Sequence, residues 1–228
     1  MPFRRHGPAP APPADPAEWR PQALGNRPHS VEDPIVEPRW GGVRVLIRIE
    51  PGVTTIVDEQ GVDCTAEFDT IAAAAADATR VKSAVLDGYL TVEPTQESRG
   101  VVLTSVEAPT AREVVGQLLV GSRKRRGLEP RPPLDSNRPI AFVAVDLLSI
   151  DGTLLFDIPL LERKRLLDSA IEQNQVVRVT PFVRPPIGSL LETWRALGFR
   201  EIVFKASNSH YVPGGHSNEW STARMPSR

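Results

Sequence analysis

The side chains that most often bind zinc are few in this chain and are poorly spaced for that role. Histidine occurs at His6, His29, His210 and His216, and the last two are six residues apart in a glycine-containing loop. Cys64 is the single cysteine, so it has no partner for a zinc pair or for an internal disulfide. The spacing of these residues therefore predicts no metal site.

Short motifs that bind phosphate or carry a nucleophile are also absent from the sequence. It contains no Walker-type loop, no dinucleotide fingerprint and no Gly-x-Ser-x-Gly elbow. The run of four cations at 123–126 is typical of a solvated loop, with a phosphate contact as the alternative. The stretch Tyr211–Gly215 is typical of a turn, and two interpretations stay open for it: a surface turn or a close approach to a ligand.

The composition is that of one globular domain with a core of ordinary size. The 228 residues are 40% hydrophobic and 24% charged. The sequence has 27 Lys and Arg and 28 Asp and Glu, so the charges nearly cancel. The net charge therefore gives no indication that the protein binds nucleic acid. No apolar run reaches the roughly 18 residues of a membrane span, and the start lacks a signal pattern. Together with the single cysteine, these features predict a cytoplasmic protein without a membrane segment.

Proline marks the beginning of the chain. Ten of the 23 prolines lie in the first 38 residues, where they disfavour helices and central strands. We therefore predict that residues 1–33 form a proline-rich leader, either disordered or wrapped around the fold. The folded domain is predicted to span 34–228.

Hydrophobic periodicity predicts strands and helices in mixed order, which favours an α+β fold over a doubly wound sheet. The first strand is predicted to bury the face that carries Val43, Val45, Ile47 and Ile49. The residues between them are predicted to form a mostly solvent-exposed face. Asp87-Gly88 is predicted to interrupt a strand. The expected strands are 43–50, 53–57, 83–86, 89–92, 101–105, 139–148, 176–182 and 201–205, and the expected helices are 65–79, from 110 onward, 160–172 and 187–197.

Five segments, in this order, resemble the adenylation (nucleotidyltransferase) domain of ATP-dependent DNA ligases. Glu37-Pro-Arg-Trp-Gly-Gly-Val-Arg44 resembles the first motif, Ala84–Gly88 the third, and Phe142–Gly152 the stretch before the central helix. Gly198–Lys205 lies where the fourth motif belongs, and Ser209–Trp220 resembles the approach to the fifth. The resemblance implies an ATP-grasp-like α+β domain with antiparallel sheets flanked by helices. It also implies ATP as cofactor and nicked DNA as partner.

The largest departure from the family pattern is at the nucleophile. The resemblance places a lysine at the position of Arg39, and that lysine would attack the α-phosphate of ATP. A lysine amine needs roughly 5 kcal/mol to lose its proton at pH 7, whereas a guanidinium needs roughly 8 kcal/mol or more. Arginine stays charged and delocalised, so Arg39 is expected to bind a phosphate and not to attack one.

Other positions depart from the pattern in the same direction. The carboxylates expected in motifs one, three and four are replaced by Gly41, Tyr89 and Arg200, so no support remains for a Mg²⁺ site. An expected arginine is Glu59, the aromatic expected to stack on adenine is Val145, and a motif-five lysine is Thr222. The remaining candidates for nucleotide or phosphate binding are Glu37, Arg39, Arg44, Asp146, Lys205 and Arg224.

Three hypotheses about function follow from this pattern. The first is a ligase-like domain that does not self-adenylate and works in DNA repair or recombination, with a partner chain supplying an OB-fold. The second is an active but altered nucleotidyltransferase that uses Lys205 or a lysine of a partner chain. The third is a nucleic-acid-binding module whose affinity falls with salt, because neutralised phosphates release counterions.

Overall fold

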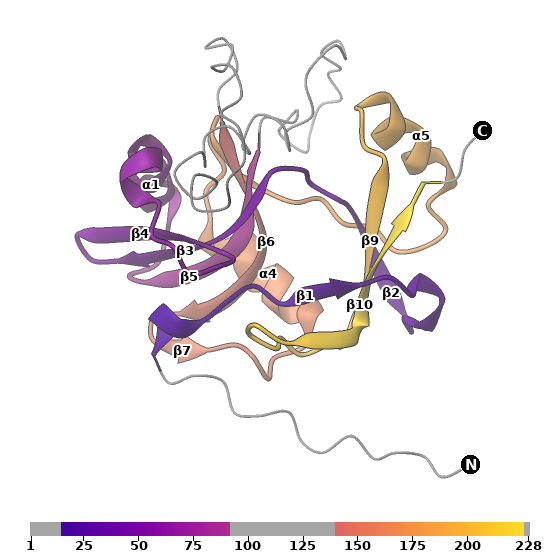
Figure 1. Ribbon diagram of the computed structural model, residues 1–228, viewed down its shortest axis with the longest axis horizontal. Coiled ribbons are helices and arrows are strands. Elements are labelled where there is room, and N and C mark those ends of the chain that lie inside the picture. Colours follow the sequence, from indigo (N-terminus) through magenta and orange to yellow (C-terminus); the bar gives the residue numbers. More distant parts are fainter. Residues whose placement is uncertain (1–14, 92–139, 226–228) are drawn as a thin grey trace, which may run out of the picture.

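The structure, a computed structural model, describes residues 15–91 and 140–225. Figure 1 shows that these residues form two β-sheets with helices packed around them. The predicted strand at 101–105, the helix predicted from Thr110 and the basic loop at 123–138 lie outside the described residues. Within the described residues, the prediction of an α+β class with mainly antiparallel sheets is confirmed.

The larger sheet, on the left in Figure 1, has the strand order β4-β3-β5-β6-β7, and β8 also pairs with β6. All its pairs are antiparallel except β6 with β8. Its strands are β3 (Val43–Glu50), β4 (Val53–Asp58), β5 (Ala84–Thr91), β6 (Ala141–Ile150), β7 (Thr153–Leu154) and β8 (Val177–Val179).

The smaller sheet has the strand order β1-β10-β9-β2. Its strands are β1 (Ala23–Gly25), β2 (Pro34–Pro38), β9 (Glu201–Ala206) and β10 (His216–Arg224). The two strands from the proline-rich start of the chain, β1 and β2, are both at the edges, where a missing backbone donor is tolerated. Residues 15–33, assigned to the leader from sequence, also contain the 3-10 helices η1 (Pro16–Glu18) and η2 (Pro28–Ser30).

In the part of the chain that the structure describes, three α-helices accompany the sheets: α1 (Asp69–Ala78), which follows the 3-10 helix η3 (Thr65–Phe68), α4 (Leu160–Ala170) and α5 (Gly188–Ala196). One face of the larger sheet packs on α1 through a core cluster that includes Ile47, Leu86 and Ile71. The opposite face meets the smaller sheet through two further clusters, one around Leu46 and Trp220 and one around Trp40 and Phe199. The space between the sheets is therefore closed by apolar side chains at two places.

The prediction that one face of β3 is exposed to solvent is wrong at two positions. Arg44 and Leu46 are buried, with 8% and 5% of their surface exposed, because the smaller sheet covers this face. Solvent reaches the strand further along, at Arg48 and Glu50. A strand between two layers is covered on both faces, which the alternation of residue types does not reveal.

The chain also differs from the predictions at Asp87-Gly88 and after Gly215. Asp87 and Gly88 do not interrupt a strand but lie inside β5, at a shift in its register against β6. The nine-residue strand β10 was not predicted, because its sequence, His216–Arg224, is largely polar and lacks clear alternation. Its pairing with both β9 and β1 holds it in the sheet.

Replacing Gly88 by alanine should destabilise the domain by about 1–3 kcal/mol, the usual cost of an overpacked core. A Cβ at this position would lie 2.4 Å from a ring carbon of Phe142 and 2.4 Å from the carbonyl oxygen of Val143. Gly188→Ala is the matched control, since a Cβ there meets nothing within 4 Å and a helix favours alanine over glycine. Urea unfolding of the two variants should show a lower midpoint for Gly88→Ala alone, and equal midpoints would contradict the packing argument.

Candidate functional site

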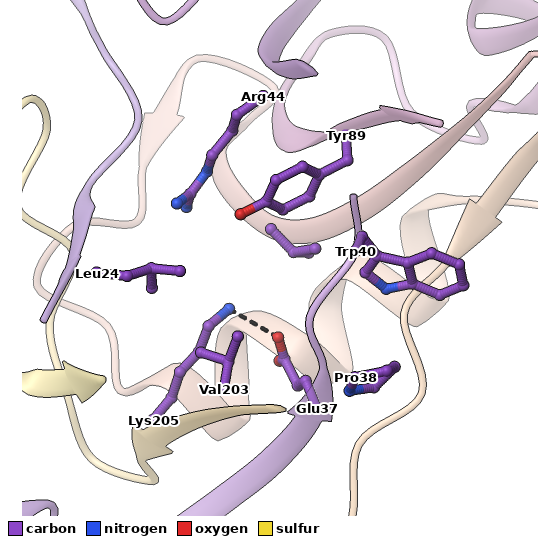
Figure 2. Close-up of a pocket in the computed structure, with 9 residues that line it drawn as sticks. Leu24, Glu37, Pro38, Trp40, Arg44, Tyr89, Val203 and Lys205 are labelled. Carbon is purple, nitrogen blue, oxygen red and sulfur yellow. Dashed lines mark ion pairs between the residues drawn. The ribbon is translucent and has the colours of Figure 1, made fainter. Parts of the chain in front are cut away.

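A small hollow lies between the two sheets, beside the charged side chains of β2 and β9. We call it the cleft pocket, and Figure 2 shows the residues around it. It is lined by Leu24, Glu37, Pro38, Trp40, Arg44, Tyr89, Val145, Val203 and Lys205. Its volume is about 230 Å³, part of which is open to solvent. The enclosed part of this hollow has room for about one water molecule, so a nucleotide does not fit in it in this arrangement.

Glu37 is held between two lysines. Its Oε2 lies 2.9 Å from Lys205 Nζ, and its Oε1 forms an ion pair with Lys164. Lys164 also donates a hydrogen bond to the carbonyl oxygen of Val145, at 2.8 Å. The ammonium of Lys205 lies 4.3 Å from the ring centre of Trp220. Both lysines and Glu37 are at most 2% exposed, so this triad is screened little by water.

The positions of these three residues follow from strand register and helix spacing. Glu37 on β2 and Lys205 on β9 lie on adjacent antiparallel strands, where Glu37 pairs with Val203 and Ile35 pairs with Lys205. Lys164 comes from α4, where Leu160, Arg163, Lys164 and Leu167 are all buried. Positions i, i+3, i+4 and i+7 share one face of a helix, so two cations share the inward face with two leucines.

Burial and charge act in opposite directions on the pKa of Glu37. Burial alone would raise it, but the ammonium groups of Lys164 and Lys205 outweigh that effect, and the pKa lies below its ordinary value of 4.5. Burial lowers the pKa of Lys164, and the neighbouring Lys205 adds to this effect, while Glu37 opposes it. The carboxylate is therefore ionised at neutral pH and serves both lysines.

Asp146 lies beneath the pocket and not on its wall. Arg163 donates to both of its carboxylate oxygens, with both distances 2.9 Å, and both residues are fully buried. The backbone N–H of Leu147 donates to Oδ1 as well. Although burial would raise the pKa of Asp146, Arg163 outweighs it and holds the pKa below its ordinary value. Asp146 thus anchors α4 to β6 and has no oxygen directed at a ligand by these contacts.

Arg44 has its donors engaged within the protein. Its Nε and Nη2 donate to the two oxygens of Asp87, at 2.9 and 2.6 Å, and its Nη1 donates to the carbonyl oxygen of Gln22, at 2.9 Å. The hydroxyl of Tyr211 donates to Asp87 at 2.7 Å. Burial first, and Asp87 second, raise the pKa of Tyr211 well above its ordinary value, so the phenol keeps its proton.

The buried polar layer between the sheets is nearly neutral. Asp87 and Asp146 are cross-strand partners on β5 and β6, and each is neutralised by its own arginine. The layer contains three carboxylates and four cations, which are Glu37, Asp87 and Asp146 with Arg44, Arg163, Lys164 and Lys205. One positive charge is in excess, so little charge is left to attract a polyphosphate.

The remaining two predicted site residues lie away from this layer. Arg39 is 40% exposed at its side chain, forms an ion pair with Glu201, and does not line the cleft pocket. Arg224 is exposed at the end of β10, opposite Glu201 in the register of β9. The structure therefore brings Glu37, Arg44 and Lys205 together at the pocket, places Asp146 below it, and leaves Arg39 and Arg224 outside.

Sequence reasoning missed Arg163, Lys164 and Leu24. The charged run Glu162–Arg165 is typical of a solvated helix face, yet Arg163 and Lys164 have the spacing of the buried leucines around them. That spacing was the available signal. Leu24 lies in the proline-rich start of the chain, where no periodicity marked it.

Across residues 15–91 and 140–225, no group of three or more His, Cys, Asp or Glu side chains is arranged to hold a metal ion. In the same part of the chain, no helix has the length and apolar character needed to cross a membrane.

Solved structures identify the class of fold. A mycobacterial DNA ligase D complexed with ATP and MES superposes with a TM-score of 0.65 at 20% identity, over 92% of this chain and 61% of that one. The ligase domain of M. tuberculosis LigD gives 0.62 at 22% identity, over 92% and 60%. The fold is that of a ligase nucleotidyltransferase domain.

The family follows from the sequence comparisons. The model of the ATP dependent DNA ligase domain matches residues 26–222, and this chain belongs to that family. The multifunctional non-homologous end joining DNA repair protein LigD of Mycobacterium tuberculosis is 26% identical over 185 residues, which are 81% of this chain and 20% of LigD. DNA ligase 1 of Korarchaeum cryptofilum is 25% identical over 187 residues, 81% of this chain and 31% of the ligase. The chain thus spans less than a third of these relatives.

Proposed function

We propose that this chain is a DNA ligase-family domain that does not self-adenylate. The observation that carries the proposal is the position of Arg39. By resemblance it occupies the place of the nucleophilic lysine, and here it is a guanidinium, paired with Glu201 and outside the cleft pocket. A permanently charged group that is paired with Glu201 and does not line the pocket has no lone pair with which to attack a phosphate there.

The contents of the cleft support the same proposal. Lys205 is the lysine on the pocket wall, but Glu37 neutralises it at 2.9 Å. Three of the five N–H donors of Arg44, one on each nitrogen, are engaged by Asp87 and Gln22, so a phosphate would meet an arginine whose charge is already paired. Both cations stabilise the fold in this arrangement, and a triphosphate would have to displace their partners.

The wider role that we propose is in DNA repair, the process that the name of the relative LigD of Mycobacterium tuberculosis states. ATP and nicked DNA are the ligands that the family suggests, and a partner chain supplying an OB-fold would complete a clamp around DNA. In this role the domain would contribute binding and not the adenylation step.

The proposal predicts that the protein gains no covalent AMP when incubated with ATP and Mg²⁺. Intact-protein mass spectrometry measures this directly, with an active ATP-dependent ligase treated in parallel as the positive control. Arg39→Lys should remain unmodified as well, because Gly41, Tyr89 and Arg200 still stand where the pattern has carboxylates. A stoichiometric gain of AMP by the unaltered chain would overturn the proposal.

A second candidate function has one observation in its favour: Lys205, unlike Arg39, lines the pocket. In an altered nucleotidyltransferase, Lys205 would have to lose its proton and its contact with Glu37 before attacking a phosphate. Labelled AMP transfer that disappears in Lys205→Arg would favour this alternative, since arginine keeps the charge next to Glu37 but cannot act as a nucleophile. Transfer that persists in that variant would exclude Lys205.

A further inference from the structure

The residues before β2 cross the open side of the cleft. We call residues 19–25 the strap. The indole of Trp19 is 1% exposed and packs edge-on against Phe156, with ring centres 4.7 Å apart. The carbonyl oxygen of Arg20 accepts from Gly214 N–H at 2.7 Å, and Ala23 N–H donates to the carbonyl oxygen of Gly215 at 2.9 Å. The strap is thus fixed to the loop that precedes β10.

Gln22 joins the strap to the buried polar layer. Its N–H donates to the Tyr211 hydroxyl at 3.0 Å, its carbonyl oxygen accepts from Arg44, and its Oε1 accepts from Val212 N–H at 2.7 Å. The residue has no exposed surface. Through Gln22, the backbone of the strap occupies one N–H donor of Arg44, a residue that lines the cleft pocket.

Leu24 extends from the strap into the cleft pocket. Figure 2 shows it across the hollow from Tyr89, between the ends of Arg44 and Lys205. Its side chain is one of the lining groups that set the pocket's volume of about 230 Å³. Glu37 and Pro38 on the other edge strand, β2, also line the pocket, and Leu24 is the lining side chain carried by the three-residue edge strand β1.

The strap pairs with β10 over a short stretch only. The strand β1 has three residues, and its pairing with β10 shifts register between Ala23 and Gly25. The side-chain Nε2 of Gln22 is buried and has no acceptor among the described residues. A buried donor without an acceptor costs stability. Detaching the strap would expose the side-chain amide of Gln22 to water and recover this cost, which offsets part of the loss of the strap's hydrogen bonds.

We propose that the strap is an autoinhibitory segment: Leu24 fills the space that an adenine nucleotide would need, and Gln22 occupies Arg44. The choice of an adenine nucleotide as the ligand rests on the proposed function. That the strap closes the pocket is argued from its own contacts. When a site is open in only a fraction of the molecules, its apparent affinity for the ligand is reduced by that fraction. Removing the block should therefore raise the affinity without any new contact.

The test is AMP binding to the full chain, measured by calorimetry without metal. Leu24→Ala removes three carbons from the mouth of the pocket and should bind AMP at least about tenfold more tightly than the unaltered chain. Leu24→Val should give an intermediate affinity and decides the matter if the alanine variant does not fold. Leu154→Ala is the matched control, because Leu154 on β7 is 52% exposed and far from the pocket lining.

Equal AMP affinities for the unaltered chain and the folded Leu24 variants would overturn the inference, and so would an equal gain in Leu154→Ala. These outcomes are separate from the fate of the proposed function. Covalent AMP on the unaltered chain refutes the inactive domain but leaves the comparison of Leu24 variants valid. Absence of adenylation together with unchanged AMP affinity refutes the strap alone.

Discussion

Glu37→Gln should lower the free energy of unfolding by about 3–5 kcal/mol, the usual cost of removing one partner from a buried ion pair. The variant keeps the shape of the side chain and removes its charge. Lys164 and Lys205 would then lie next to each other, each at most 2% exposed, without the carboxylate that serves both. Urea unfolding at neutral pH, followed by circular dichroism, measures the loss.

The dependence of this loss on pH checks its cause. Because the folded pKa of Glu37 lies below its ordinary value of 4.5, the carboxylate contributes stability above pH 4.5, and the contribution is lost as the pH falls through the folded pKa. The difference between the two proteins should therefore shrink in acid. Glu172→Gln, at a carboxylate whose side chain is 68% exposed, should leave the midpoint unchanged. A loss that stays constant in acid would rule out the charge as its origin.

Arg163→Met is expected to have an effect of similar size, about 3–5 kcal/mol, because it leaves Asp146 charged and fully buried. The change also removes donors from the carbonyl oxygens of Ile158 and Ser209. Since Asp146 pairs across the sheet with Asp87, the unneutralised carboxylate would face a second one. Thermal and urea unfolding should both show the loss.

A neighbour on the same helix provides the control for this variant. Arg165 has a side chain that is 65% exposed and pairs with Glu162, so Arg165→Met should leave the unfolding midpoint unchanged. Removing both buried charges, with Asp146→Leu added to Arg163→Met, should restore part of the stability, because a buried apolar pair replaces an ion pair at little cost. A double variant as unstable as the sum of its parts would contradict this account.

Much of the fold follows from local rules in the sequence. The strands predicted at 43–50 and 53–57 are found as β3 and β4, and the helix predicted at 160–172 is found as α4, because local periodicity marks these elements. The second buried face of β3 was not predicted, because it depends on a second sheet whose two inner strands, β9 and β10, come much later in the sequence. The strand β10 was missed because pairing with β9, and not its own residue pattern, makes it a strand.

The candidate site was predictable in part. The motif spacing selected Glu37, Arg44 and Lys205, and these do meet at the pocket. Their pairing was not predictable, because Lys164 and Arg163 reach the layer from a helix more than a hundred residues after β2 and β3. The side-chain direction of Arg39 depends on Glu201, which no local pattern connects to it. The spacing of the motifs in the sequence identifies which residues come together at the pocket. The ion pairs that each of these residues forms decide whether its charge is still available to bind a ligand.

The buried polar layer has a consequence for how relatives of this chain should be compared. Glu37, Arg44, Asp146 and Lys205 match the ligase pattern and are each locked into an ion pair, so folding alone is sufficient reason to keep them. Arg39 and Arg200, which depart from the pattern, have exposed side chains that folding does not constrain in this way. The needs of a stable interior can therefore account for these motif residues whether or not the domain turns over a substrate. Among relatives of this chain, the exposed nucleophile position is a better guide to activity than the number of matching motifs.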